Sequence, residues 1–563
     1  MPRKLVVRFA VAVVAVWLLV ILVKLPSLSA PPQGASRREA VVHHEIVLPP
    51  PKATRQPVQV PAEQDNQSEP EAEETPAPLP PNRRRTPPPP TPAETDAPET
   101  EAADAVPEPP RDGKWRRPTT QTNLQQERRD VVVEMIRSSW EAYKSHAWGY
   151  DEFAPLSKRA TNWGHGKGIG STIVDALDTL LIAGLDVEAA EAIEWVEGTV
   201  DYTQNIKLSG FETTIRILGG LLSTYQITGR KRVLEQATVL GSRLAKAFDT
   251  GSGVPDNYVN LKTGHHEGAH WNGGAAILSE LGSLQMEHFT LSRESGDPSF
   301  HKKARRAVEV IAPTCNNGYC PRQFHGAHSA GGVAGLGSFG DSFYEYLLKQ
   351  WILSGKTDKL YKEMWDRAAR HTIQTSTTVG GHLIPNGQET GGSMEHLACF
   401  SGGLFALSYI HGGDKSHLDF AEKIGETCHA MYVSTPTGLA PDVAHPDANG
   451  GFHASDAKYI LRPETVETFF YLWKATKDPR YRDWGFEIVE AINKHLKIQG
   501  AGYAGAADVN HVPVRHNDNM ETFWFAETLK YLYLLFSEDE LIDLKEWVFN
   551  TEAHPMRVAK PLA

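Results

Sequence analysis

Two glutamates stand in a segment that is otherwise apolar and aromatic. In YILRPETVETFF (459–470), Glu464 and Glu467 are three residues apart, and this spacing places both carboxylates on one face of a helix. Arg462-Pro463 precedes them, and proline is favoured at the first position of a helix. Such carboxylates are either first-turn glutamates left in water, where the helix dipole favours them, or functional groups beside a buried surface.

Further apolar helical segments carry acidic residues in the same manner. Glu212 and Arg216 are spaced i, i+4, which is typical of a surface ion pair, although the residues around them indicate close packing. Asp341 follows a glycine-rich loop. It is either the N-cap of a helix expected to begin at Ser342 or a functional carboxylate. The other acidic residues of this kind are Asp175, Asp178, Glu345, Glu521 and Glu527.

Several carboxylates in one concave site would suit two kinds of chemistry. A pair of carboxylates hydrolyses a glycosidic bond, with one acting as acid and the other as base. A cavity rich in oxygen atoms also binds Ca²⁺. The sequence contains no serine-triad motif, P-loop or dinucleotide fingerprint, and HHEGAH (265–270) is not the HExxH motif of zinc proteases.

Repeated helical hairpins are predicted to position these residues. From about residue 122, an apolar helix, a short turn and an amphipathic helix recur at intervals of roughly 60–80 residues. We expect an all-α closed ring of hairpins rather than an open solenoid, with a small terminal β element after Leu544. The hairpins are predicted at 218–240, 344–368, 404–428 and 469–492, with a fifth beginning at 524.

The N-terminal region has a different composition. Basic residues precede an apolar run from Phe9 to Val23, which predicts a cytosolic tail (1–8), a membrane anchor (9–24) and a lumenal, type II body. A cleaved signal peptide is the alternative. Residues 31–118 hold 22 of the 38 prolines, so 25–121 is predicted to be a disordered stalk before a catalytic domain at 122–563. The net charge of −12 argues against a nucleic-acid partner.

The four cysteines are Cys315, Cys320, Cys399 and Cys428. A lumenal body favours two disulfides, and four cysteines allow three pairings. Pairing between neighbours, Cys315 with Cys320 and Cys399 with Cys428, is one of these three.

Seven motifs in order make the chain resemble the class I α-1,2-mannosidases, glycoside hydrolase family 47, from about residue 125 to 558. The resemblance implies an (α/α)7 barrel, Ca²⁺ as cofactor, inversion at the anomeric carbon, and removal of terminal α-1,2-linked mannose from high-mannose N-glycans. The motifs are IVDALDTLLIAGL, FETTIRILGGLLS, GDSFYEYLLKQW, MEHLACF, LRPETVET, METFWFAETLKYLYLLF and FNTEAHP.

The resemblance also implies roles for individual residues. Glu212 and Asp341 are the acid-side carboxylates, either of which would serve as proton donor, and Glu464 is the general base. Thr551 would bind Ca²⁺ through its hydroxyl and carbonyl oxygens, and Cys399 with Cys428 matches the family's disulfide. The residues expected to bind substrate, some of them through metal-bound waters, are Arg216, His396, Arg462, Glu467, Glu521 and Glu552.

Two positions depart from the family pattern. Phe339 stands where the endoplasmic-reticulum branch has arginine, which predicts trimming of more than a single mannose, because a strong hydroxyl ligand is lost. Asp442 stands where glutamate is usual.

We expect a monomer in the Golgi or endoplasmic reticulum membrane. The alternatives are a mannosidase-like lectin of glycoprotein quality control and an unrelated helical-barrel glycosidase.

Overall fold

The computed structural model describes residues 123–315, 317–385 and 390–560. The predicted tail (1–8), anchor (9–24) and stalk (25–121) all lie outside these residues. Within the described part of the chain, no helix combines the length and apolar character that crossing a membrane requires.

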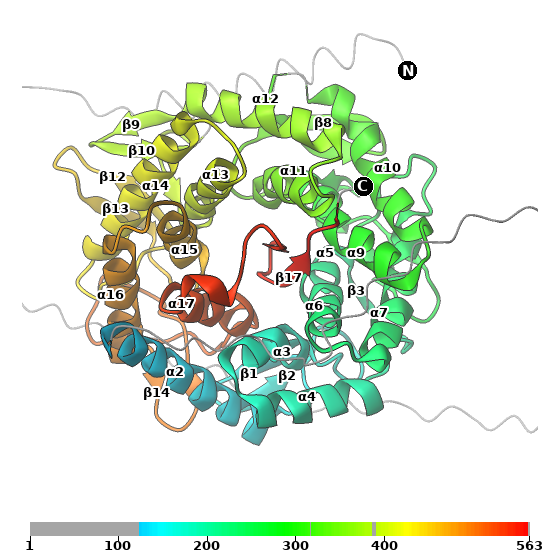
Figure 1. Cartoon of the computed structure of the whole chain (residues 1–563), viewed down its shortest axis with the longest axis horizontal. Coiled ribbons are helices and arrows are strands. Elements are labelled where there is room, and N and C mark those ends of the chain that lie inside the picture. The colour runs from blue at the N-terminus through cyan, green and yellow to red at the C-terminus, as the bar shows by residue number, and fades with distance from the viewer. Residues whose placement is uncertain (1–122, 316, 386–389, 561–563) are drawn as a thin grey trace, which may run out of the picture. The chain divides into compact units, whose positions relative to one another are not determined.

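The described helices form two concentric layers (Figure 1). Each of the first six inner helices packs against an outer helix that is its neighbour along the chain. The last inner helix, α17, packs against the first outer helix, α2, and contacts between α17 and α3 close the ring. The outer layer comprises α2 (Asn123–Ala147), α4 (Asp186–Gly198), α7 (Lys231–Leu244), α10 (Ser299–Ile311), α12 (Lys359–Thr375), α14 (Lys415–Val433) and α16 (Arg480–His495). The inner layer comprises α3 (Ser171–Ala183), α6 (Gly219–Thr228), α9 (Gln285–Ser295), α11 (Asp341–Leu353), α13 (Phe400–Ile410), α15 (Glu464–Thr476) and α17 (Lys530–Leu535).

Shorter elements connect these helices. Two π-helical turns, η1 (Thr213–Leu218) and η6 (Trp524–Leu529), lead into α6 and α17, and the remaining helical turns are α5 (Gly210–Glu212), α8 (Leu278–Gly282), η2 (Ala245–Phe248), η3 (His270–Asn272), η4 (Ala312–Thr314), η5 (His396–Cys399) and η7 (Asp539–Leu541). All strand pairs among the described residues are antiparallel. The sheets are β1 (Glu152–Ala154) with β2 (Arg159–Thr161); β3 (Lys207–Ser209), β4 (Tyr258–Asn260) and β5 (His266–Glu267); β6 (Ala276–Ile277), β7 (Cys320–His325) and β8 (His328–Ala334); β9 (Thr377–Val379) with β10 (His382–Ile384); β11 (Met394–Glu395), β12 (Val443–Pro446) and β13 (Phe452–Asp456); β14 (Lys497–Ile498) with β15 (Gly502–Tyr503); and β16 (Trp547–Phe549) with β17 (Pro555–Arg557).

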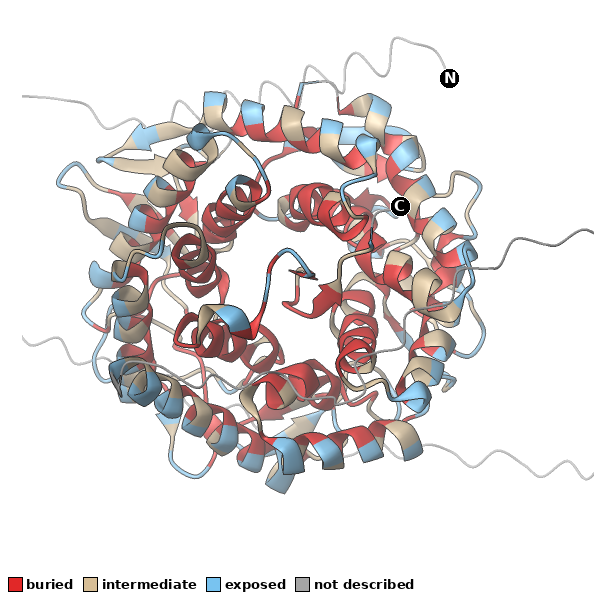
Figure 2. Cartoon of the chain, viewed as in Figure 1, coloured by how far each residue is buried: buried red, intermediate tan, exposed pale blue. Residues whose placement is uncertain are grey.

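Residue patterns explain which layer a helix joins. The inner helices are buried around most of their circumference, as Figure 2 shows, whereas the outer helices are buried mainly on the side that faces the inner ring. In α10, for example, Phe300, Ala304 and Val308 repeat at intervals of four and are buried, as expected of an amphipathic helix. At the contact between α13 and α15, a Cβ on Gly402 would come within 2.6 Å of Thr468 Cγ2, so glycine is needed there.

The four complete hairpins predicted from the sequence are confirmed as α6–α7, α11–α12, α13–α14 and α15–α16. Two helix starts differ by one residue from the prediction. α11 begins at Asp341 rather than Ser342, and α15 begins at Glu464, with Pro463 as its N-cap rather than its first residue. Both acidic residues therefore open an inner helix.

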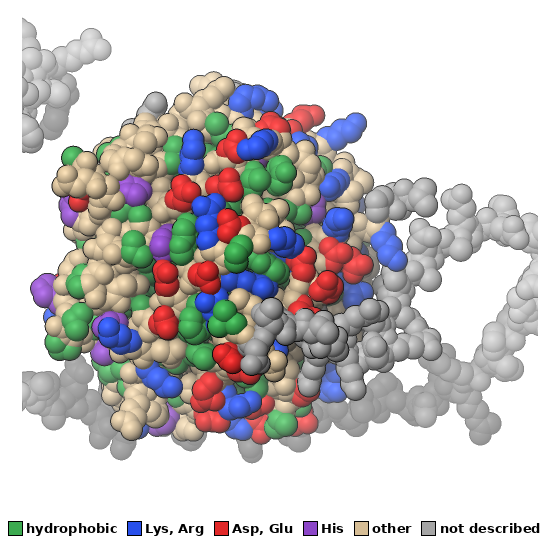
Figure 3. Space-filling model, turned by 60° about the vertical axis from the view of Figure 1, so that its left-hand side comes forward, with side chains coloured by type: hydrophobic (Ala, Val, Ile, Leu, Met, Phe, Trp, Pro, Cys, Tyr) green, Lys and Arg blue, Asp and Glu red, His purple; other side chains and the backbone are tan. Residues whose placement is uncertain are grey.

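The chain terminus and the cysteines also follow the predictions. The terminal β element is the hairpin β16–β17, which packs against α11 and α6 inside the inner ring (Figure 1). Cys315 pairs with Cys320 and Cys399 with Cys428, so the pairing between neighbours is the one found. The outer face in Figure 3 carries acidic and basic side chains interspersed.

Candidate active site

One cleft lies at the end of the barrel where inner helices α11 and α15 begin. Its volume is about 270 Å³, and η1, α11, α15, η6 and the turn between β16 and β17 all contribute to its walls. The cleft therefore gathers side chains that are more than 300 residues apart in the sequence. The predicted site residues that line it are Arg216, Asp341, Arg462, Glu464, Glu467, Thr551 and Glu552.

Glu464 is held as a carboxylate by two neighbours. Its Oε2 lies 2.8 Å from His396 Nδ1, and its Oε1 lies 3.4 Å from Arg462 Nη1. Burial by itself raises the pKa of Glu464, but the charge of Arg462 and the hydrogen bond with His396 outweigh burial and lower the pKa below its usual value. Glu464 is thus ionised near neutral pH and able to accept a proton.

His396 does not line the cleft, contrary to the prediction that it borders a sugar subsite. The ring is fully buried behind Glu464, and its second nitrogen, Nε2, lies 2.8 Å from the hydroxyl of Tyr432. His396 opens η5 directly after β11, and its buried imidazole contacts Glu464 and Thr465, the first two residues of α15. The geometry makes His396 a positioning residue for Glu464.

Asp341 has the opposite electrostatic environment. Its Oδ1 accepts a hydrogen bond from the Ser342 backbone N–H at 2.8 Å, and no described residue forms an ion pair with it. Burial, together with the negative charges of Glu345, Glu395 and Glu464, raises the pKa of Asp341 to about 7. Asp341 therefore holds a proton at pH values where Glu464 has none, which is the division expected of an acid and a base.

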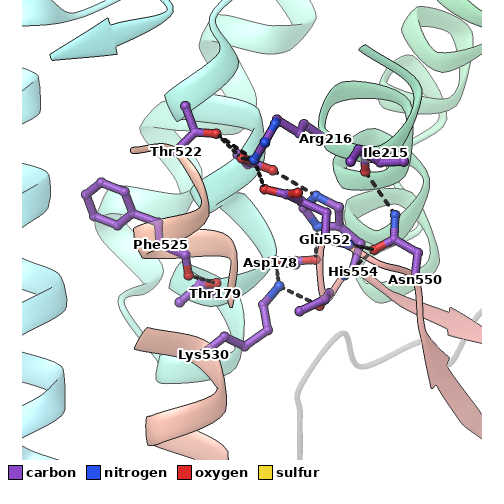
Figure 4. Close-up of polar contacts among 12 residues, drawn as sticks. Asp178, Thr179, Ile215, Arg216, Thr522, Phe525, Lys530, Asn550, Glu552 and His554 are labelled. Atoms are coloured by element: carbon purple, nitrogen blue, oxygen red, sulfur yellow. Dashed lines mark hydrogen bonds and ion pairs between the residues drawn. The ribbon is translucent and has the colours of Figure 1, made fainter. Parts of the chain in front are cut away.

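A buried polar network fixes the turn that forms one wall of the cleft (Figure 4). Arg216 pairs with Glu552 of the turn, and His554 Nδ1 lies 2.7 Å from Asp178 Oδ2 on α3. Lys530 Nζ lies 2.8 Å from Asp178 Oδ1. These charges are removed from water but paired, so the network ties the last turn of the fold to α3, η1 and α17.

Comparison with known proteins places the chain in a family. The sequence model of glycosyl hydrolase family 47 matches residues 135–558. The chain belongs to glycosyl hydrolase family 47. Two curated relatives are mannosyl-oligosaccharide 1,2-alpha-mannosidase MNS1 of Arabidopsis thaliana, 39% identical over 450 residues (77% of this chain, 79% of the relative), and mannosyl-oligosaccharide 1,2-alpha-mannosidase IB of Homo sapiens, 40% identical over 458 residues (77% and 70%).

A solved structure supports the same assignment. The alpha-1,2-mannosidase from Trichoderma reesei superposes with a TM-score of 0.69 at 28% identity, covering 77% of this chain and 99% of that one. The resemblance to family 47 seen in the sequence is thereby confirmed, and the helical ring is an α/α barrel.

Two predicted site residues of this family 47 chain lie beside the cleft rather than in its lining. Glu212 reaches it only through Arg216, whose Nε donates a hydrogen bond to Glu212 Oε2 at 2.8 Å. The Glu212 side chain is 40% exposed. Glu521 is partly buried, and its Oε1 accepts a hydrogen bond from Asn519 Nδ2 at 2.8 Å. Neither Glu212 nor Glu521 is therefore among the residues that line the cleft.

Two charged residues of the cleft region had no assigned role from the sequence. Glu527 lines the cleft, and burial together with the charges of Glu467 and Glu464 raises its pKa. Lys349 is buried next to Glu345 and lies 3.7 Å from Glu467. The only sequence signal for Lys349 was its i, i+4 spacing from Glu345, which is also typical of a surface pair.

The lower part of the cleft has the chemistry of a site for a hard cation. Thr551 lies there with Glu467, Glu527 and Glu552, and no described residue hydrogen-bonds to the hydroxyl or carbonyl oxygen of Thr551. Thr551 and these three glutamates offer oxygen atoms, the ligands that Ca²⁺ prefers. Among the described residues, no group of three or more His, Cys, Asp or Glu side chains is placed to hold a metal ion.

The structure shows where the two residues that depart from the family pattern, Phe339 and Asp442, lie relative to the cleft. Phe339 lines the cleft with backbone φ of 73°, a left-handed conformation that is uncommon for a bulky residue. Asp442 lies outside the lining and accepts a hydrogen bond from Arg462 Nε. Its shortened carboxylate therefore still anchors the arginine that faces Glu464.

Proposed function

We propose that this family 47 chain is an inverting exo-glycosidase that hydrolyses terminal α-1,2-linked mannose of high-mannose N-glycans in the secretory pathway. The observation that carries the proposal is the opposite shift of the Asp341 and Glu464 pKa values within one small cleft. A glycan-binding lectin would need no such pair. The curated relatives, named as mannosyl-oligosaccharide 1,2-alpha-mannosidases, support the choice of substrate.

The two carboxyl groups would divide the reaction between them. Glu464 takes a proton from a water molecule as the water oxygen attacks the anomeric carbon. Asp341 gives its proton to the glycosidic oxygen, directly or through a water, as the bond to the anomeric carbon breaks. Attack from the face opposite the leaving group inverts the configuration, which in such enzymes requires about 6.5–9.5 Å between the carboxyl groups.

The cofactor we propose is Ca²⁺, bound by the hydroxyl and carbonyl oxygens of Thr551. When bound, the ion would orient the hydroxyl groups of the terminal mannose and help to distort its ring. Glu467 and Glu552 line the cleft beside Thr551 and would hold waters of the ion, as would Glu527.

The proposed activity is tested with disaccharides of defined linkage. We expect the full-length chain to release mannose from mannose-α-1,2-mannose and not from the α-1,3 and α-1,6 isomers. The released sugar should appear first as the β-anomer, which proton NMR detects before mutarotation. Cleavage of all three isomers at similar rates, or first appearance of the α-anomer, would rule out the proposed activity.

The pH profile tests Asp341 as proton donor. Because its pKa is raised to about 7, the protonated form is lost as the pH rises through that value, while Glu464 stays ionised. The ratio kcat/KM should therefore fall by about tenfold per pH unit above pH 7. Asp341→Asn should have low activity without this alkaline fall. An unchanged alkaline fall in Asp341→Asn would assign the proton to another group, with Glu212 the first candidate.

Thermal unfolding tests the metal site independently of activity. An ion that binds only the folded state raises the midpoint temperature of unfolding. Excess chelator should therefore lower this temperature, and added Ca²⁺ should restore it. Thr551→Ala should need about 10–100-fold more Ca²⁺ for the same shift. Thr357→Ala, at an exposed threonine in the turn between α11 and α12, is the control. An identical Ca²⁺ response in both variants would remove Thr551 from the site.

For the cell, we propose that residues 9–24 anchor the protein as a type II, monomeric enzyme of the Golgi or endoplasmic reticulum membrane. The basic residues before the apolar run support this orientation. The relative of Rattus norvegicus named as an endoplasmic reticulum mannosidase, 39% identical over 470 residues, supports the compartment class.

A further inference from the structure

A second cleft, with no wall residue in common with the active-site cleft, lies at the same end of the barrel. It forms where outer helices α2 and α4 end and the chain approaches the start of α3, and its volume is about 680 Å³. The active-site carboxylates Asp341 and Glu464 also stand at the first residues of inner helices. Because inner and outer helices alternate in direction, the ends of α2 and α4 and the starts of the inner helices lie at the same end of the barrel.

Aromatic side chains form a large part of this second cleft. Trp148, Tyr150 and Trp195 line it, and all three are at least partly exposed. None of the described residues accepts a hydrogen bond from the indole N–H of Trp148 or Trp195. A tryptophan that is only part of the core usually satisfies this donor, so both N–H groups are left for solvent or a ligand.

The two tryptophans are held in fixed orientations. Trp148 packs edge-on against Trp140, with ring centroids 5.7 Å apart. Gly170 lies against Trp195 so closely that a Cβ would come within 2.3 Å of its Cζ3, and the backbone of Gly170 has φ of 71°. A rigid aromatic surface loses little side-chain entropy when a ligand binds.

The polar groups of the second cleft suit a neutral ligand rich in hydroxyl groups. Its only charged lining residues are Lys167 and Asp201, one of each sign. Gln204 uses its Nε2 to donate a hydrogen bond to the Asp201 carbonyl oxygen at 3.1 Å, which leaves its Oε1 as an acceptor. The lining contains no pair of carboxylates for catalysis and no cluster of cations for a phosphate.

We propose that this second cleft is a non-catalytic glycan-binding site that takes a hexose of a mannose-rich glycan. A pyranose presents apolar C–H faces to aromatic rings and hydroxyl groups to polar side chains, and both partners are present here. Because the cleft lies at the same end of the barrel as the active site, it would bind one branch of a glycan while another is trimmed. The identity of the sugar rests on the proposed function.

Fluorine NMR of 5-fluorotryptophan-labelled protein tests the site directly. The probe is the free nine-mannose oligosaccharide, added to the full-length Glu464→Gln chain so that the glycan is not consumed. Phe substitutions assign the signals of Trp148, Trp195 and Trp271, the last of which reports on the active-site end because its ring centroid lies 6.5 Å from that of Phe339. We expect the Trp148 and Trp195 signals to shift saturably.

Thr199→Arg should block the second cleft without disturbing the core. Thr199 lines the cleft and is exposed at the C-terminal cap of α4. The matched control is Ser434→Arg, at the exposed C-terminal cap of α14. Thr199→Arg should abolish the Trp148 and Trp195 shifts and raise KM for the nine-mannose glycan by about three- to tenfold. Hydrolysis of the disaccharide should stay unchanged in both variants.

The outcomes separate this inference from the proposed function. If the Trp148 and Trp195 signals do not move, the second site is overturned, whether or not Trp271 responds. Equal KM values for Thr199→Arg and Ser434→Arg would also overturn it. The proposed hydrolase activity is decided separately, by the disaccharide assay.

Discussion

Replacing Glu464 with glutamine is expected to lower the rate of mannose release by about 10²–10⁴-fold. The amide keeps the size of the side chain but cannot accept a proton from water, so the loss should fall on kcat. The side chain sits at the first residue of α15, contacting His396 and Arg462. Initial-rate kinetics on mannose-α-1,2-mannose measures the effect.

The control for this loss is Glu490→Gln on the exposed face of α16, which should keep full activity. Glycan binding by Glu464→Gln, measured by calorimetry, should persist because the rest of the cleft is intact. Full activity of Glu464→Gln would remove this residue from the role of base. Such a result would favour the lectin alternative only if the natural chain also failed to release mannose.

Replacing Lys530 with methionine is expected to cost about 3–5 kcal/mol of the free energy of unfolding. Lys530 and its partner Asp178 are fully buried, 2.8 Å apart, and Lys530 Nζ also donates to the Ala553 carbonyl oxygen at 2.6 Å. Charges of Lys530 and His554 outweigh burial and lower the pKa of Asp178 to about 2. Without the lysine, Asp178 keeps a buried negative charge with only His554 opposite. Urea unfolding measures the loss.

Two variants sharpen the stability experiment. Lys415→Met removes a lysine whose pair with Asp419 is exposed on α14, and the free energy of unfolding should not change measurably. Adding Asp178→Asn to Lys530→Met should recover part of the stability, because the unpaired charge is removed. If Lys530→Met is no less stable than Lys415→Met, the buried pair does not hold the fold together.

The hairpins could be predicted because local patterns encode them. An apolar run followed by a turn and an amphipathic helix shows the secondary structure and its buried face directly, as in α13–α14. The start of α15 was displaced by a single residue, because proline fits either the cap or the first turn. The terminal β hairpin was visible as an apolar run after Leu544, but its place inside the ring was not.

The site was harder to predict, because its chemistry depends on contacts between distant segments. Glu464 was identifiable as a carboxylate in an apolar helix, but its ionised state depends on the charge of Arg462 nearby and also on His396, which is 68 residues away in the sequence. His396 was expected in a sugar subsite and lies behind Glu464. Lys349 had the same local signature as a surface ion pair, and only packing places it among buried acids.

The sequence by itself therefore determined the helical hairpins, the acidic helix starts and the family, because each is written in residue types at fixed spacing along the chain. Only the tertiary structure decided which carboxylates meet, which one holds a proton and which side chains support them. Burial and the distances between charges set a pKa, and both arise when segments hundreds of residues apart close into one ring.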